Sequence, residues 1–328
     1  SAARIETSKE FAKELMAKYG IPTAAFSTFT DFDAAMEYVK AGKLPIVLKY
    51  DGLAAGKGVV IAMNMEEAEA TLRDMLLDTK FGEGRVVIEE FLTGEEFSLM
   101  CFVAGNHVVP MPVAQDHKRA YDNDEGPNTG GMGTYSPSLL FNEELEKRIR
   151  EEILEPTLAG FQKDGLDFKG VLFIGLMLSE DGPKVIEFNN RFGDPETQVV
   201  LPRLKNDIID VMEACVDGTL DQINLEFEDK ANVCVVLASD GYPLAYDKGL
   251  PITGFENFDN KEDYFCFHAG TAFNAENKIV TNGGRVLGIT ATGKDLKEAR
   301  SKAYEATNWV NFDNKYMRSD IGKAIDEA

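Results

Sequence analysis

The sequence predicts an α+β protein, in which two α+β units are followed by a smaller mixed α/β domain at the C-terminus. Two observations predict this class. Segments with apolar residues at the helical i, i+3, i+4, i+7 spacing alternate with short β-branched runs, and turn residues separate several of those runs. With 328 residues, of which 44% are hydrophobic, the chain is long enough for roughly two domains with cores of their own.

The first part of the chain is expected to form helices around a small sheet. Helices are predicted over residues 8–19, from a cap at Thr30, and from a capping-box-like pair at Asn64 and Glu67; strands are predicted over 46–49 and 59–62. The strands and the last two helices form the smaller α+β unit, residues 25–93. The larger unit is predicted to combine residues 1–24 with residues 94–229.

The rest of the chain continues this alternation. The larger unit is predicted to contain a hairpin over 97–113, a helix over 142–163, a second hairpin around Glu180-Asp181-Gly182, and a helix from Pro195 to Gly218. The C-terminal domain, residues 230–328, is predicted to have strands within 232–239, 265–273 and 278–293, and a closing helix with Leu296, Ala299, Ala303, Ala306 and Val310 on one face.

Composition excludes several classes of function. Only 34 basic residues face 56 acidic ones, and the net charge of −22 argues against a nucleic-acid surface. No window approaches the roughly 18 apolar residues of a membrane span, and no signal peptide is recognisable. The four cysteines stand singly and the three histidines are scattered, so disulfides and a histidine metal site are not expected. We expect a cytoplasmic protein, monomeric or weakly self-associating, with an anionic small molecule as ligand.

The stretch YDGLAAGKGVVIA, residues 50–62, has the composition of a phosphate-binding loop, because glycine N–H groups approach closely and a lysine adds charge. It is not a Walker P-loop, since Gly58 stands where that motif has a hydroxyl and a strand follows in place of a helix. Lys57, between Gly56 and Gly58, and Lys49, at the end of the preceding strand, are the candidate phosphate ligands. The alternative is that both are ordinary surface lysines.

Glu187 and Asn189 lie two residues apart on a predicted strand, so their side-chain oxygens point to the same side. Hard oxygen ligands of this kind suit Mg²⁺, although a solvated strand face has the same pattern. The turn that follows is rich in charge and includes Arg191 and Asp194. Such a concentration of charge beside an apolar hairpin favours a functional site.

Two further stretches carry candidate contacts. In IEEFLTGEE, backbone groups near Glu90 and Leu92 could hold a purine while Glu96 accepts ribose hydroxyls; the alternative is a charged strand end. The glycine-rich run over residues 115–137 is predicted to be irregular, and Thr129-Gly130-Gly131 within it could wrap a phosphate or an oxyanion. A disordered surface loop is the alternative for that run.

Four segments together resemble the glycinamide ribonucleotide synthetase family, the phosphoribosylamine–glycine ligases. They are VLKYDGLAAGKGV, IEEFLTGEEFS, QDHKRAYDNDEGPNTGGMG and EFNNRFGDPETQ, and RFGDPETQ is similar to the signature of that family. The resemblance extends from the first predicted helix to the final DIGKAIDEA. It implies an ATP-grasp fold, in which two α+β subdomains clasp ATP, and makes residues 25–93 the lid subdomain.

The resemblance also implies roles for the candidate residues. Lys49 and Lys57, with Gly56 and Gly58, would contact ATP phosphates; Glu90 and Leu92 would form the adenine hinge; Glu96 would reach the ribose; Glu187 and Asn189 would hold Mg²⁺, or Mn²⁺ in its place; Arg191 and Asp194 would be catalytic; and Asp116, Lys118, Thr129, Gly130 and Gly131 would face glycine and phosphoribosylamine.

The implied reaction is an ATP-dependent ligation in which glycine becomes glycyl phosphate and the phosphoribosylamine nitrogen then displaces phosphate. Two departures from the family pattern bear on it. Gly175 stands where many ATP-grasp enzymes have another metal-binding glutamate, and the nucleotide-fold domain that opens the family members is not recognisable, so we expect ATP–Mg²⁺ to bind better than phosphoribosylamine. Another ATP-grasp carboxylate ligase and an ATP-binding module without turnover are the alternatives.

Overall fold

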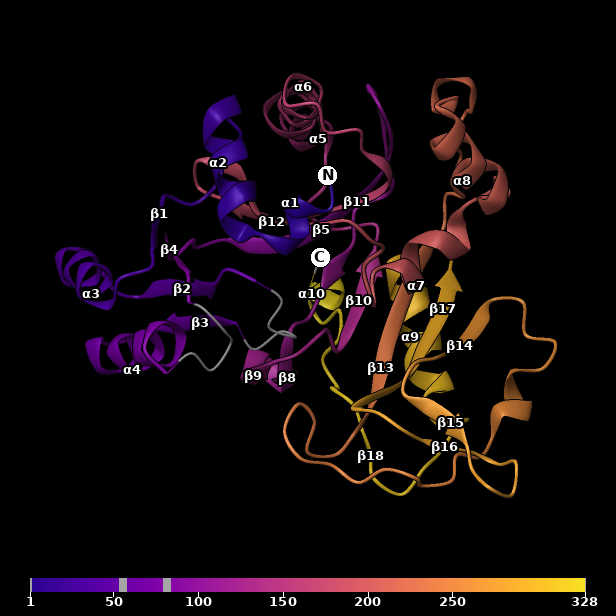
Figure 1. Ribbon diagram of the computed structural model, residues 1–328. Coiled ribbons are helices and arrows are strands. Elements are labelled where there is room, and N and C mark those ends of the chain that lie inside the picture. Colours follow the sequence, from indigo (N-terminus) through magenta and orange to yellow (C-terminus); the bar gives the residue numbers. More distant parts are fainter. Residues whose placement is uncertain (1, 53–57, 79–83, 328) are drawn as a thin grey trace.

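The computed structural model describes residues 2–52, 58–78 and 84–327, which contain three main sheets (Figure 1). The lid sheet is antiparallel in the order β1-β4-β2-β3, and α3 and α4 pack on it around Leu48, Leu72 and Ile88. Its elements are β1 (Phe26–Phe29), α3 (Phe32–Ala41), β2 (Ile46–Tyr50), β3 (Val59–Ala62), α4 (Met65–Leu76) and β4 (Val86–Glu90).

Of the two helix N-caps predicted in this unit, one is confirmed and the other is wrong. Asn64 caps α4 as predicted, because its Oδ1 accepts from the Glu67 N–H at 2.9 Å. The predicted cap at Thr30 is wrong: Asp31 caps α3, accepting from the Ala34 N–H at 2.8 Å. Threonine and aspartate both cap helices well. Because α3 begins one residue later than predicted, its cap is a carboxylate, which also interacts favourably with the positive end of the helix dipole.

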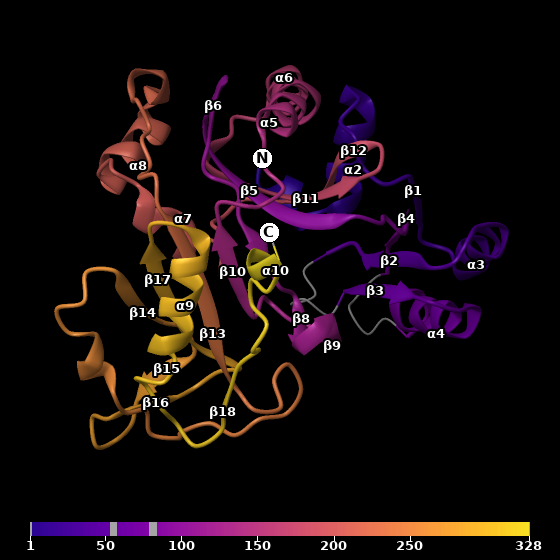
Figure 2. The ribbon, with the colours of Figure 1, turned by 180° about the vertical axis from the view of Figure 1, so that it is seen from behind.

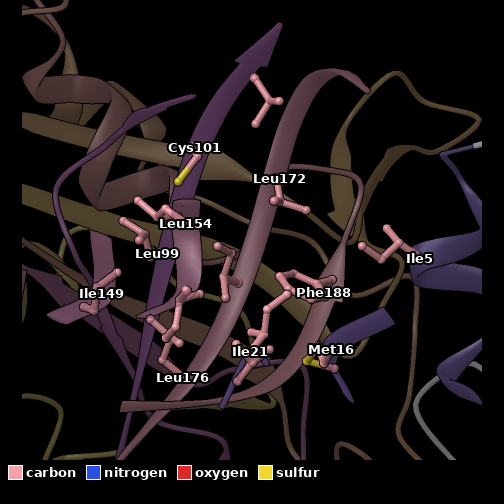
Figure 3. Packing of buried hydrophobic residues seen from close by; sticks show 14 of the residues in the cluster. Ile5, Met16, Ile21, Leu99, Cys101, Ile149, Leu154, Leu172, Leu176 and Phe188 are labelled. Carbon is pink, nitrogen blue, oxygen red and sulfur yellow. The ribbon is translucent and has the colours of Figure 1, made fainter. Parts of the chain in front are cut away.

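The central sheet has the order β12-β11-β5-β6 and is buried on both faces. Its strands are β5 (Glu95–Ala104), β6 (His107–Pro110), β11 (Lys169–Ser179) and β12 (Gly182–Asn189). One face packs on α1 (Arg4–Thr7), α2 (Lys9–Tyr19) and a helix over α5 (Glu143–Ile149), a π-helical turn (Arg150–Leu154) and α6 (Glu155–Lys163). Figure 3 shows this core, in which Leu99 and Cys101 of β5 lie near Leu154.

The segment after Pro195 covers the other face of the central sheet, and it is broken where a single helix to Gly218 was predicted. The structure has α7 (Thr197–Val200), a 3₁₀ turn (Leu201–Arg203) and α8 (Ile208–Asp217). Pro202 removes a backbone donor, and Asp207 starts α8 anew by accepting from the Ile209 N–H. The predicted helix end at Gly218 is confirmed, where the left-handed φ of 75° favours glycine.

The third sheet has the order β14-β17-β13-β10-β7, with β18 paired to β13, and α9 packs against β17 and β13 (Figure 2). Its strands are β7 (Gln115–Asp116), β10 (Gly133–Ser136), β13 (Ala231–Ser239), β14 (Tyr264–His268), β17 (Arg285–Gly293) and β18 (Lys315–Tyr316). The other elements here are the pairs β8 (Arg119–Tyr121) with β9 (Glu125–Asn128) and β15 (Thr271–Phe273) with β16 (Ile279–Thr281), the helices α9 (Leu296–Ala306) and α10 (Ala324–Glu327), and 3₁₀ turns at Asp122–Asp124, Leu220–Gln222 and Phe255–Phe258.

This sheet crosses the predicted domain boundary near residue 230. β10 pairs antiparallel with β13, joining Gly133 to Val235 and Ser136 to Asn232. The prediction that residues 115–137 have no regular structure is wrong, because β7 to β10 all lie there. β8 and β9 pair with each other, whereas β10 pairs with β13 about a hundred residues further along the chain, so local composition gives no sign of that second pairing. No described helix is long and apolar enough to cross a membrane.

Candidate active site

A cavity of about 350 Å³ lies where the lid sheet meets the central sheet. The elements α2, β2 and β4 supply charged side chains to this cavity, and β12 supplies side-chain oxygens. The residues that matter for the argument are Lys9 and Lys13 of α2, Lys49 of β2, Glu89 of β4, and Glu187 and Asn189 of β12. The structure therefore brings together Lys49, Glu187 and Asn189, which the sequence placed in separate motifs.

Two buried lysines share one carboxylate in the wall of this cavity. The Lys13 ammonium lies 3.1 Å from Glu89 Oε2 and the Lys49 ammonium lies 2.9 Å from Glu89 Oε1. All three side chains are under 10% exposed. Burial lowers the pKa of Lys13 to about 8, although the Glu89 carboxylate opposes that shift. The wall carries two cationic groups for one anion, an arrangement that suits an incoming polyanion.

The fold of β12 places Glu187 and Asn189 at this cavity. Gly175 of β11 pairs with Glu187, whereas Leu176 pairs with Val185, so Ile186 is an extra residue in a β-bulge. Its carbonyl oxygen accepts from the Lys49 ammonium at 3.4 Å, while Phe188 turns into the core. The expected position of Gly175 opposite Glu187 in this hairpin is confirmed. A Cβ on Gly175 would lie 3.3 Å from Glu187 Cγ, so glycine leaves this carboxylate room.

The chemistry of Glu187 and Asn189 fits a hard divalent cation. The Asn189 side chain is buried, and its Nδ2 has no hydrogen-bond partner among the described residues, so the amide is free to turn its oxygen toward an ion. No group of three or more histidine, cysteine or carboxylate side chains among residues 2–52, 58–78 and 84–327 could form a complete metal cage. Mg²⁺ does not need one, because it takes few protein ligands and completes its shell with phosphate and water.

A smaller pocket joins this cavity to the glycine-rich region. It is lined by Glu96, Asp116, Lys118 and Glu187 among others, so four predicted site residues meet there. Burial raises the pKa of Asp116 well above its usual value, and the neighbouring Glu196 carboxylate raises it further. Burial alone would lower the pKa of Lys118, but the surrounding carboxylates, Asp116 foremost, reverse that and raise it. Lys118 is therefore a firmly charged cation among acids.

The turn after β12 holds Arg191 and Asp194 near the cavity mouth. Arg191 is exposed and lines the cavity, and its Nε lies 3.4 Å from Glu6 Oε1. The other Glu6 oxygen accepts from the Asn190 N–H at 2.8 Å, which ties the turn to α1. Asp194 Oδ1 accepts from the Gln198 side-chain amide at 2.8 Å. Arg191 thus lines the same cavity as Glu187, whereas Asp194 lies toward β17, with its Oδ1 3.5 Å from Arg285 Nη1.

Arg285 of β17 connects that turn to Thr129-Gly130-Gly131. Its Nη1 donates to the carbonyl oxygens of Gly130, at 3.0 Å, and Asp194, at 2.9 Å. The Thr129 hydroxyl donates to the Lys118 carbonyl oxygen and accepts from the Gly131 N–H. Gly131 has a φ of 124° and a Cβ there would lie 2.8 Å from the Asp116 carboxylate, so only glycine fits. The predicted substrate residues therefore form one connected surface.

Neither Glu90 nor Leu92, the predicted adenine hinge, lines the cavity. Glu90 ends β4, and its carboxylate accepts from the Ala25 N–H at 3.0 Å while lining a separate groove with Phe91. Leu92 follows at a half-buried position, and Gly58 lines the main cavity. Gly56 and Lys57 lie outside the described residues, so their assignment stays a prediction.

The sequence analysis did not identify three of the cavity residues, namely Lys9, Lys13 and Glu89. Lys9 and Lys13 are four apart on α2 with Met16 on the same side, a spacing that places them on one helix face. A lysine at a core position of an amphipathic helix is the available signal, since lysine is almost never fully buried without a partner. Glu89 carries the corresponding signal, because an acid in the buried strand VVIEE needs a cation.

His117 makes the stability of this region depend on pH. Its Nδ1 lies 3.1 Å from the Gly133 carbonyl oxygen and its Nε2 accepts from the Gly322 N–H at 3.1 Å, which requires the neutral ring. Burial, helped by the Arg318 charge, lowers the pKa of His117 from the ordinary 6.5. The unfolded chain therefore binds the proton first, and this contribution to stability, present above pH 6.5, is lost as the pH falls.

We expect the free energy of unfolding, measured in urea between pH 8 and pH 5, to fall below pH 6.5 by up to about 1.4 kcal/mol per pH unit more than in His117→Gln. The glutamine amide cannot be protonated in this range, so its pH profile supplies the control. Parallel profiles for the two proteins would contradict the assignment of the neutral ring.

Comparisons with known proteins cover nearly the whole chain. A profile described as the ATP-grasp (A) domain of phosphoribosylglycinamide synthetase matches residues 7–197, and one described as the C domain matches residues 232–324. The phosphoribosylamine–glycine ligase of Halalkalibacterium halodurans is 53% identical, over 99% of this chain and 76% of that protein. That of Vibrio vulnificus is 48% identical, over 98% and 75%. The crystal structure of the Thermotoga maritima phosphoribosylamine–glycine ligase has a TM-score of 0.89 at 40% identity, covering 97% of this chain and 79% of that one.

Proposed function

Because the chain belongs to the phosphoribosylglycinamide synthetase family, we propose that the cavity between Lys49 and Glu187 is the place where it joins glycine to 5-phosphoribosylamine. The reaction consumes ATP and yields glycinamide ribonucleotide, ADP and phosphate, a step of purine biosynthesis. One observation carries the placement: two buried lysines line the same cavity as Glu187 and Asn189. Cations for a polyphosphate therefore share one cavity with oxygen ligands for the metal that accompanies it.

ATP would lie with its phosphates along the wall of Lys49, Lys13 and Lys9. The adenine would follow the end of β4 toward Leu92, where the backbone from Glu90 onward offers hydrogen-bonding groups, and Glu96 would accept the ribose hydroxyls. Glu89 lines the same cavity and bridges the two lysines. Lys57 and Gly56 would add to phosphate binding from outside the described residues.

The enzyme uses ATP with a divalent metal, and we assign the ion as Mg²⁺, which Mn²⁺ can replace. Glu187 and Asn189 would hold it, since both are hard oxygen ligands on one side of β12. When bound, the ion neutralises phosphate charge as it develops during transfer. Gly175 supplies no further carboxylate, so additional ligands would come from phosphate and from water.

The ligation itself needs no nucleophile from the protein. A glycine carboxylate oxygen attacks the γ-phosphorus, ADP leaves, and the amine nitrogen of phosphoribosylamine then attacks the glycyl carbonyl carbon and expels phosphate. Arg191, exposed in the same cavity as Glu187, would hold the glycine carboxylate. Lys118 and the Thr129–Gly131 backbone would orient the second substrate, with Asp116 and Asp194 facing its polar groups. The contribution of the chain is positioning and charge neutralisation.

Glycine labelled with ¹⁸O in its carboxylate tests this sequence of steps. One labelled oxygen should appear in the phosphate released with glycinamide ribonucleotide, because the acyl–oxygen bond breaks in the second step. A parallel assay with bicarbonate in place of glycine distinguishes a carboxylating relative. Product formed without ¹⁸O in phosphate would contradict the glycyl phosphate, and turnover with bicarbonate alone would contradict the choice of substrate.

Because the pKa of Lys13 is lowered, we expect nucleotide binding to be accompanied by proton uptake in mildly alkaline solution. Its pKa of about 8 leaves much of it neutral at pH 8.5, and the ATP phosphates should raise that pKa again by favouring the charged ammonium. Titration calorimetry at pH 8.5 in buffers of different ionisation enthalpy should therefore show net proton uptake. Lys13→Arg, which stays charged, should bind ATP without it. Equal uptake by both proteins would place the proton elsewhere.

A further inference from the structure

The C-terminal segment Tyr316–Gly322 is bonded along its length to residues 117–124, the beginning of the glycine-rich region. The Tyr316 hydroxyl donates to the Ala120 carbonyl oxygen at 2.8 Å. The Ser319 N–H donates to Asp122 Oδ1 at 2.8 Å, and its hydroxyl bonds the other oxygen of that carboxylate. The two segments are almost two hundred residues apart in the sequence, and neither is part of a long helix or strand.

Arg318 is at the centre of this contact and is 1% exposed. Its Nε and Nη2 donate to the two Asp320 oxygens at 2.8 and 2.9 Å, a two-pronged ion pair. Its Nη1 donates to the Arg119 carbonyl oxygen at 3.1 Å and to Asp124 Oδ1 at 2.9 Å. Asp320 also accepts from the Asn123 N–H at 2.8 Å. One guanidinium thus joins the start and the turn of the β8–β9 hairpin to the C-terminal segment.

The contact reaches the substrate surface through His117. The Gly322 N–H donates to its Nε2, and the His117 N–H donates to the Gly133 carbonyl oxygen at 2.9 Å. The residues on either side of this histidine, Asp116 and Lys118, both line the pocket with Glu187. A shift of the hairpin would therefore move a cation and an acid relative to the metal ligand.

We propose that Arg318 is a positioning residue for the ligation, which holds Asp116 and Lys118 in place for glycine and phosphoribosylamine without touching either substrate. The inference rests on the proposed function of this pocket. Arg318 lies on the C-terminal side and makes no contact with the Lys13–Glu89–Lys49 wall, so it should affect the glycine or phosphoribosylamine end of the reaction and not ATP.

Arg318→Lys tests the proposal, because lysine keeps the charge but cannot bridge Asp320, Asp124 and the Arg119 carbonyl together. We expect the KM of glycine, of phosphoribosylamine or of both to rise about tenfold or more, since small misplacements of reacting groups cost large factors in rate. The Kd of ATP–Mg²⁺ should change less than twofold. Arg203→Lys is the matched control: Arg203 is buried, and it bonds Ser136 and the Glu228 carbonyl away from this hairpin.

Asp124→Asn provides a second variant should Arg318→Lys fail to fold, because Asp124 is 71% exposed and its loss leaves the Arg318–Asp320 pair intact. The same KM values should rise, by a smaller factor. Unchanged KM values with a hairpin that proteolysis cuts more readily would overturn the proposal. The proposal would also be overturned if Arg318→Lys and Arg203→Lys weakened ATP binding and raised both KM values to the same extent. A wild-type chain that fails to ligate would instead refute the function on which the proposal rests.

Discussion

Glu187→Gln should lower turnover about a hundredfold or more while the chain stays folded. A neutral amide is a poorer ligand for a hard cation, and the charge that the ion neutralises in phosphoryl transfer is worth several kcal/mol. The loss should be partly offset at high metal concentration, because a weakened ligand raises the metal requirement. Turnover titrated with Mg²⁺ for both proteins measures the two effects together.

The hairpin that carries Glu187 offers a matched control. Glu180 lies exposed at its turn, so Glu180→Gln removes the same charge from the same strand pair at a distance from the cavity. This variant should keep wild-type turnover and metal dependence. If Glu187→Gln behaves like it, the carboxylate does not hold the metal and the assignment of β12 as the metal strand is wrong.

Lys49→Met should weaken ATP binding and lower kcat/KM for ATP about a hundredfold. The ammonium is buried, so its interaction with phosphate is little screened by water. The substitution also leaves Glu89 with Lys13 as its remaining ion-pair partner, which should cost up to about 3 kcal/mol of stability. Titration calorimetry with ATP–Mg²⁺ and urea unfolding measure the two losses separately.

A second variant separates ligand contact from fold. Glu89→Gln leaves the Lys13 and Lys49 ammonium groups without their shared carboxylate, so stability should fall, while ATP affinity should stay near the wild-type value because both cations remain. Lys43→Met, at an exposed position before β2, controls for loss of one positive charge. If Glu89→Gln loses ATP affinity as Lys49→Met does, the loss follows from the fold, and Lys49 does not contact phosphate.

The predicted ATP-grasp fold with a C-terminal domain is confirmed, and most elements followed from local patterns. Ser8 caps α2, and β3 has the bounds that its β-branched run predicts. The main error lies where pairing between segments far apart in the sequence determines the structure. β10 exists because β13 pairs with it, and no residue near Gly133 encodes that partner. The single helix expected after Pro195 is a different kind of error, because local residues break it: Pro202 removes a backbone donor and Asp207 caps a new helix.

The site shows the same division between local and distant information. Glu187 and Asn189 were predictable because their spacing on one strand is itself the signal. Lys13 and Glu89 were not, since each looks unremarkable alone and gains meaning only when α2 meets β4 across 76 positions of sequence. Arg318 is a stronger case, because only the fold shows that it bonds the backbone of Arg119. The division of the chain at residues 24, 93 and 229 stays a prediction, and the sheet shared by β10 and β13 shows how closely the parts are joined.

Anomalous diffraction from crystals grown with Mn²⁺ and a non-hydrolysable ATP analogue tests the placement of the active site most directly. The Mn²⁺ peak should lie about 2.1 Å from a Glu187 carboxylate oxygen, with the Asn189 oxygen as a second protein ligand and the analogue's phosphates turned toward Lys49 and Lys13. An ordered analogue with its Mn²⁺ bound away from Glu187, or phosphates that contact neither lysine, would contradict the account.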